Sequence, residues 1–134
     1  MKPDLELLMA EAERARRRAH APYSRFAVGA ALLADDGRIF TGANVENASY
    51  GLTVCAERVA LWKGVSEGAR SFAALAVAGP ARRSAPPCGA CRQVLAEFAP
   101  ELRVFWRNAS GRRISRSLDQ LLPLAFRLTR PRAR

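Results

Sequence analysis

Cys55-Ala56-Glu57 and Pro87-Cys88-Gly89-Ala90-Cys91 are the two stretches that constrain the fold of this chain most strongly. The first stands at the predicted start of a helix that begins near Thr53 or Cys55 and ends at about Ser66. The second stands at the predicted start of a helix from about Cys88 to Phe98, where a preceding proline is favourable. If both helices begin beside one point, their free N–H groups and positive dipole ends converge there and favour thiolates.

The cysteines form a candidate metal site. Cys88 and Cys91 are three residues apart, so in a first helical turn their sulfurs share one face, and Cys55 would supply a third thiolate. Three protein ligands leave one zinc position for water, which is typical of catalytic rather than structural sites. Glu57 is placed to exchange protons with that water. His20, the single histidine, is the conventional residue that would close the site instead.

Two arginines are the nearby cations: Arg58, next to Glu57, and Arg92, next to Cys91. Three thiolates on one zinc ion leave a net negative charge, so hydrogen bonds from a nearby cation to sulfur are expected to offset it. Arg58 is the favoured candidate for this role. Arg92 is the second, and an ordinary surface position on its helix is an equally good interpretation of it.

The remaining sequence predicts a mixed sheet with helices on both faces. A helix from its N-cap Asp4 to about Ala19 precedes a buried strand, which Asp35-Asp36-Gly37 joins to the next strand as a hairpin. Helices and strands then alternate, which favours a three-layer α/β/α domain with five strands. The predicted strands cover residues 27–34, 38–43, 72–78, 102–107 and 112–116, and Ser117 is the predicted N-cap of a short helix over 118–122.

Length and composition fit one domain. The chain has 134 residues, of which 49% are hydrophobic, enough for a single buried core. We expect this domain to span residues 1–127 and to be followed by a basic, disordered tail over 128–134. The longest apolar run, Phe72–Ala78, is far shorter than the roughly 20 residues of a membrane span. With no targeting pattern at the amino terminus, a cytoplasmic location is expected.

The net charge of +10 is compatible with a polyanion partner. Basic residues are dense only at Arg14–Arg18 and over 127–134, and aromatic residues make up 7% of the chain, too few for a base-stacking surface. An arginine-rich solvated surface is therefore favoured, with no nucleic-acid partner. Three cysteines are an odd number for a disulfide framework, which indicates metal or redox chemistry.

Four motifs together are similar to those of the short, homotetrameric, zinc-dependent cytidine deaminases. Cys-x-Glu followed by Pro-Cys-x-x-Cys is the three-cysteine variant of the zinc deaminase signature. The similarity spans roughly Leu5 to Phe126, with these motifs in the same order: Tyr23-Ser24-Arg25-Phe26-Ala27-Val28-Gly29-Ala30, Asn44-Val45-Glu46-Asn47-Ala48-Ser49-Tyr50, Cys55-Ala56-Glu57-Arg58 and Pro87-Cys88-Gly89-Ala90-Cys91-Arg92-Gln93. The resemblance implies a cytidine deaminase-like fold.

The resemblance also implies an activity and a cofactor. The reaction would be the hydrolytic deamination of cytidine and deoxycytidine to uridine and deoxyuridine, with release of ammonia, in pyrimidine salvage. One zinc ion per subunit would be held by Cys55, Cys88 and Cys91. Glu57 would carry protons between water, the pyrimidine N3 and the departing amine.

Six further residues would contact the nucleoside. The resemblance places Phe26 against the base, Asn44 and Glu46 on the ribose, the Ala56 backbone on the pyrimidine, and Tyr50 and Phe126 in the pocket of a neighbouring subunit of a homotetramer. The chemistry of Glu46 agrees, because a carboxylate accepts from a sugar hydroxyl and repels a phosphate, which favours a free nucleoside. Composition alone would assign Phe26 and Phe126 to the core.

Three alternatives use the same residues. A nucleic-acid-editing deaminase or RNA-binding protein fits the charge of +10, but the Asn44 and Glu46 pair and the missing basic aromatic groove count against it. A structural zinc module would use His20 as a fourth ligand. A deaminase of a cytosine-containing antibiotic of the blasticidin type shares both cysteine motifs, and the Asn44-x-Glu46 motif favours cytidine over that substrate.

Overall fold

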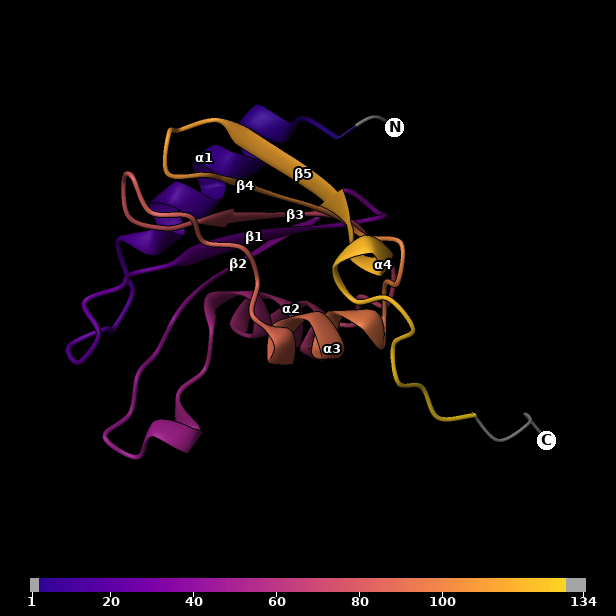
Figure 1. Ribbon diagram of the computed structural model, residues 1–134. Coiled ribbons are helices and arrows are strands. Elements are labelled where there is room, and N and C mark those ends of the chain that lie inside the picture. Colours follow the sequence, from indigo (N-terminus) through magenta and orange to yellow (C-terminus); the bar gives the residue numbers. More distant parts are fainter. Residues whose placement is uncertain (1–2, 130–134) are drawn as a thin grey trace.

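Five strands form one mixed sheet in the order β2-β1-β3-β4-β5 (Figure 1). The computed structural model describes residues 3–129, and within them the strands are β1 (Gly29–Ala34), β2 (Ile39–Ala43), β3 (Phe72–Ala78), β4 (Arg103–Arg107) and β5 (Arg113–Ser117). The β3–β4 pair is parallel and the other neighbouring pairs are antiparallel. The predicted mixed five-stranded sheet is confirmed, and each strand end lies within two residues of its predicted position.

One face of the sheet is covered by α1 (Leu5–Arg16) (Figure 1). The side chain of Asp4 accepts a hydrogen bond from the Leu7 N–H at 3.0 Å, so the predicted N-cap is confirmed. The helix ends three residues before the predicted Ala19, and His20 instead pairs with Val45 in an isolated β-bridge. Leu8, Met9 and Ala12 of α1 are buried against the sheet.

The opposite face carries α2 (Ala56–Ser66), α3 (Gly89–Ala96) and the short α4 (Leu118–Leu121) (Figure 1). The predicted three-layer arrangement is therefore confirmed. The main hydrophobic core lies between these helices and the sheet, around Leu32, Leu61 and Leu75. A capping box formed by Ser117 and Gln120 starts α4, as predicted for Ser117.

Gly42 of β2 sets how closely α2 approaches the sheet. A Cβ atom at this position would lie 2.6 Å from both the Ala56 carbonyl oxygen and the Ala60 nitrogen. Glycine therefore lets the backbone of the first turns of α2 rest directly on β2. This contact fixes the end of α2 that carries Cys55 and Glu57.

Within residues 3–129, no helix is long and apolar enough to cross a membrane. The predicted basic tail begins at residue 128, and most of it, residues 130–134, lies outside the described part of the chain.

Candidate metal centre and adjoining pocket

Three sulfurs meet where α2 and α3 begin. Cys55 is the N-cap of α2, Cys88 is the N-cap of α3, and Cys91 lies in the first turn of α3. The Cys55 and Cys88 Sγ atoms are 3.7 Å apart, those of Cys88 and Cys91 are 3.4 Å apart, and all three lie within 4.8 Å of one another. The prediction that two helix starts bring the three thiols together is confirmed.

The sulfur spacing fits a zinc ion. Zinc–thiolate bonds of about 2.3 Å in tetrahedral geometry place sulfurs about 3.8 Å apart, close to the observed separations. Among the described residues, these cysteines are the one group of three or more metal-binding side chains gathered this closely, and His20 is not part of it. The alternative of a structural site closed by His20 is therefore not supported.

Arg58 is the cation at the sulfur cluster. Its Nη2 lies 3.4 Å from the Cys55 Sγ, so the predicted contact between this arginine and a thiol is present. A hydrogen bond from the Cys91 thiol, with a further contribution from Arg58, lowers the pKa of Cys55 to about 5. The same Cys55–Cys91 hydrogen bond raises the pKa of Cys91. The cluster thus favours a thiolate at Cys55, the protonation state that a metal ligand needs.

Arg92 does not contact a sulfur. Its Nε donates to the Pro87 carbonyl oxygen and its Nη1 donates to the Leu121 carbonyl oxygen, both at 2.8 Å. These bonds tie the approach to α3 to the end of α4. Arg92 therefore supports the backbone that carries Cys88 and Cys91, and Arg58 is the arginine that meets the thiols.

Glu57 is a buried carboxyl beside the sulfurs. The residue lies in the first turn of α2, is 4% exposed and lines the same pocket as Cys55 and Cys88. Burial raises the pKa of Glu57 to about 7. With that pKa the carboxyl can both accept and donate a proton near neutral pH, which is what a general acid–base group requires.

The pocket beside Glu57 has a volume of about 360 Å³, within the usual range for small-molecule sites. It gathers seven of the predicted site residues: Phe26, Asn44, Glu46, Cys55, Ala56, Glu57 and Cys88. These residues come from the loop before β1, the segment after β2 and the starts of α2 and α3. Residues that are distant in the sequence therefore line a single cavity.

Asn44 holds the pocket wall together. Its Oδ1 accepts from the Val28 N–H at 2.9 Å, and its Nδ2 donates to the Phe26 carbonyl oxygen at 2.8 Å. These two bonds occupy backbone groups that a longer β1 would use, so β1 begins at Gly29 rather than at the predicted residue 27. One amide hydrogen and one lone pair of Asn44 remain for a ligand.

Glu46 is oriented by the segment before Phe26. Its Oε1 accepts from the backbone N–H groups of Tyr23 (2.9 Å) and Ser24 (3.1 Å), and its Oε2 accepts from the Ser24 hydroxyl. The bond from that hydroxyl is the main reason why the pKa of Glu46 is lowered. Ser24 stands in a quoted motif, yet sequence reasoning gave it no role, because its contact with Glu46 spans 22 positions.

Phe26 lines the pocket under an arginine that the sequence analysis did not single out. The guanidinium carbon of Arg83 lies 4.9 Å from the centre of the Phe26 ring, in cation–π range. Nothing in the local sequence around Arg83 indicates this contact, since the two residues belong to separate loops.

Tyr50 and Phe126 lie outside this pocket. They are 76% and 69% exposed. Tyr50 packs edge-on against Tyr23, with ring centres 6.1 Å apart. The Phe126 carbonyl oxygen accepts from Gln93 Nε2 at 3.1 Å. The described chain therefore does not bring these two side chains to its own sulfur cluster.

Comparisons with known proteins agree with this geometry. Residues 2–106 match the model of the cytidine and deoxycytidylate deaminase zinc-binding region. Over 124 residues the chain is 53% identical to the cytidine deaminase of Halalkalibacterium halodurans, with 92% of this chain and 94% of the relative covered.

Other relatives give the same result. The cytidine deaminase of Sporosarcina psychrophila is 51% identical over 124 residues, covering 92% of this chain and 91% of that one. The crystal structure of cytidine deaminase from Burkholderia pseudomallei superposes with a TM-score of 0.85 at 50% identity, covering 90% of this chain and 98% of that one.

Proposed function

Because the chain belongs to the cytidine and deoxycytidylate deaminase family, we propose that the pocket beside Cys55 and Cys88 is its active site and that Glu57 moves the protons of the reaction. The chain is a zinc-dependent cytidine deaminase, converting cytidine and water to uridine and ammonia. One observation carries the assignment of the site: Glu57, a buried carboxyl, lines the same cavity as Cys55 and Cys88.

Cys55, Cys88 and Cys91 would hold the zinc ion. When bound, zinc supplies Lewis acidity, which makes water nucleophilic near neutral pH. Burial, which raises the pKa of Glu57 to about 7, suits this carboxyl to take up the two protons of the attacking water one after the other, and to pass the first to the pyrimidine N3 and the second to the leaving amine. Arg58 positions the Cys55 thiolate through its hydrogen bond.

The other pocket residues would recognise a nucleoside. Phe26 offers an aromatic face to the base, and the backbone of Ala56 borders the pyrimidine. Glu46, already oriented by Tyr23 and Ser24, would accept from a ribose hydroxyl, and the free amide hydrogen of Asn44 would donate to the same sugar. A carboxylate at this place disfavours a phosphorylated sugar, so cytidine and deoxycytidine are the proposed substrates, in pyrimidine salvage.

The test of the catalytic assignment is Glu57→Gln. This change keeps the shape of the side chain and removes its proton transfer, so we expect retained zinc and a loss of roughly four decades in turnover of cytidine. Glu67→Gln, on an exposed residue at the other end of α2, is the matched control and should leave turnover unchanged. Near-native turnover by the Glu57→Gln protein would refute the assignment.

We propose that the chain forms a homotetramer with shared active sites, in which the exposed aromatic residues contact a neighbouring subunit. Tyr50 and Phe126 are too exposed to stabilise the single chain, and apolar side chains of this size on a surface favour an interface. If Phe126 acts in a neighbouring pocket, mixing inactive Glu57→Gln and Phe126→Ala proteins should restore part of the activity, because some sites then hold both intact residues. The measurement is turnover after subunit exchange, and no recovery would contradict the shared site.

The three thiols also support a proposal about the compartment. Three thiols that must stay reduced to bind zinc favour a reducing environment, and the cytoplasm is the compartment that we propose.

A further inference from the structure

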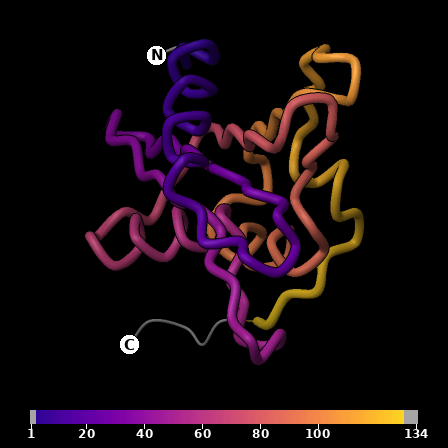
Figure 2. The backbone as a smooth tube through the Cα atoms, turned by 90° about the vertical axis from the view of Figure 1, so that its left-hand side faces the viewer, coloured from indigo at the N-terminus to yellow at the C-terminus, as the bar shows by residue number. Residues whose placement is uncertain are grey.

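A second and larger cavity lies at the C-terminal ends of β3 and β4, beside α1. Its volume is about 550 Å³, and it is bordered by α1, the loop after β3 and the turn between β4 and β5. Figure 2 shows α1 and the β4–β5 turn rising on the same side of the molecule, with the loop after β3 close to that turn. Two residues connect it with the candidate active-site pocket: Val77 lines both cavities, and Arg83, which lines this one, stacks on the Phe26 ring of the other.

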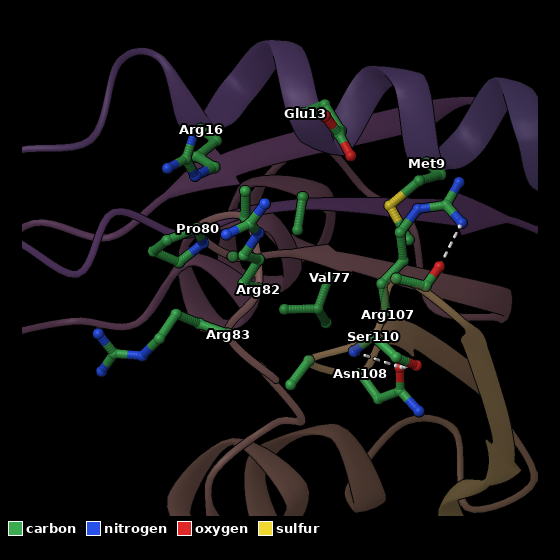
Figure 3. A pocket seen from close by; sticks show the side chains of 15 residues that line it. Met9, Glu13, Arg16, Val77, Pro80, Arg82, Arg83, Arg107, Asn108 and Ser110 are labelled. Carbon is green, nitrogen blue, oxygen red and sulfur yellow. Dashed lines mark hydrogen bonds between the residues drawn. The ribbon is translucent and has the colours of Figure 1, made fainter.

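The lining of this cavity is strongly cationic. It contains four arginines, Arg16, Arg82, Arg83 and Arg107, against one acid, Glu13 (Figure 3). Within residues 3–129, the ion pairs involve other arginines and leave these four without a carboxylate partner. The Arg83 guanidinium lies over the Phe26 ring, so Arg16, Arg82 and Arg107 are the three that can face an anion in this cavity. Guanidinium groups without counter-charges repel one another, so an anion placed among these three is attracted by each of them.

The arginines are partly held in place and still have donors free. Arg16 Nε donates to the Ala27 carbonyl oxygen at 3.0 Å, which fixes its stem and leaves its terminal N–H groups available. Arg107 Nη1 donates to the Gly111 carbonyl oxygen at 3.3 Å, in the turn that borders the cavity. In Figure 3, Arg82 lies between Arg16 and Arg107. Donors on three separate segments thus surround one space.

The backbone at Arg82 is unusual. Its φ is 64°, in the left-handed region that suits glycine or asparagine, and the Arg83 N–H closes the turn by donating to the Pro80 carbonyl oxygen at 3.1 Å. A residue with a Cβ atom is strained in this conformation. Strained residues of this kind cluster at functional sites, and here the strained residue is the arginine in the middle of the cationic lining.

We propose that this cavity binds the phosphate chain of a small oligophosphate ligand. Guanidinium forks match phosphate oxygens, and several forks on separate segments suit two or three linked phosphates better than one. The lining contains no aromatic side chain on which a base would stack, which favours recognition of the phosphates over recognition of a nucleic acid.

The test is isothermal titration of the zinc-loaded protein with sodium tripolyphosphate at fixed ionic strength. We expect one tripolyphosphate per chain, bound about five- to tenfold more weakly by Arg82→Gln and by Arg107→Gln. Arg103→Gln removes the same charge from an exposed position of the same strand β4, outside the cavity, and should change the affinity less than twofold. Glu13→Gln should tighten binding about twofold, because it removes the one acid of the lining.

Further ligands separate the sources of the phosphate chain. Cytidine turnover by each variant confirms that it is folded. If a nucleoside triphosphate binds as tightly as tripolyphosphate, nucleotides are identified as ligands. If the nucleoside triphosphate binds more weakly than tripolyphosphate, free oligophosphates are identified as ligands. Both results support the proposal. Equal affinities of the Arg82, Arg107 and Arg103 variants, displacement of tripolyphosphate by the product uridine, or binding of a single-stranded oligonucleotide but not of tripolyphosphate would overturn it.

Discussion

Replacing Gly42 with alanine should displace the start of α2, which carries Cys55 and Glu57. The new Cβ would lie 2.6 Å from the Ala56 carbonyl oxygen and from the Ala60 nitrogen, whereas ordinary contact begins at 3.4 Å. Both atoms belong to the backbone, so relief requires α2 to move from β2 by about 0.8 Å. Zinc ligation tolerates displacements of about 0.2 Å, so the end of α2 that carries Cys55 and Glu57 would be misplaced.

The expected effects of Gly42→Ala are twofold. Overpacking costs about 1–3 kcal/mol, offset by about 0.5 kcal/mol because alanine restricts the unfolded chain. We therefore expect the free energy of unfolding to fall by roughly 0.5–2.5 kcal/mol. A displacement near 1 Å at a reacting site can reduce the rate about 100-fold, so kcat/KM for cytidine should fall by one to two decades.

Urea unfolding, zinc content and cytidine turnover are the three measurements. Gly51→Ala is a neutral control, because a Cβ there has no atom within 4 Å. Gly64→Ala is a control for strain at the other end of α2, where the new Cβ would meet the Phe40 ring at 2.9 Å, and it should lower stability but keep zinc and turnover. A Gly42→Ala protein with native stability, zinc content and turnover would refute the reasoning that this contact positions the site.

Three further substitutions separate the roles of neighbouring residues. Arg58→Ala removes a hydrogen bond that lowers the pKa of Cys55, so zinc should be lost faster to a competing chelator than from the native protein. Arg92→Ala removes two bonds to carbonyl oxygens and should lower the free energy of unfolding by about 2 kcal/mol in urea, with one zinc still bound per chain. Ser24→Ala should raise the pKa of Glu46, which the hydroxyl lowers. Since a ribose hydroxyl needs the ionised carboxylate, affinity is lost as pH falls through this pKa, so KM for cytidine should begin to rise at a higher pH than in the native protein.

The sequence alone predicted the helices, the strands and the cluster of three cysteines that could hold a metal ion. Strands and helices follow the local periodicity of apolar residues. Asp4 and Ser117 cap helices and Gly37 lies in a turn, and each of these roles involves only residues a few positions away in the sequence. The spacing of Cys88 and Cys91 likewise predicted a shared face, because one helical turn fixes it. Arg58 is three residues from Cys55, so its contact with that thiol lies within the same local range.

The tertiary structure decided which residues far apart in the sequence contact one another. Arg58 and Arg92 both lie within four residues of a cysteine of the cluster, yet Arg92 donates to the Leu121 carbonyl, 29 positions away, and not to a sulfur. The same holds for the bonds of Asn44 to the Phe26–Val28 backbone, for the Arg83 ring contact and for the cationic cavity beside α1. Periodicity in the sequence indicates which face of a helix or strand is buried. Which distant side chains come into contact depends on how the helices pack against the sheet, and only the folded chain shows that packing.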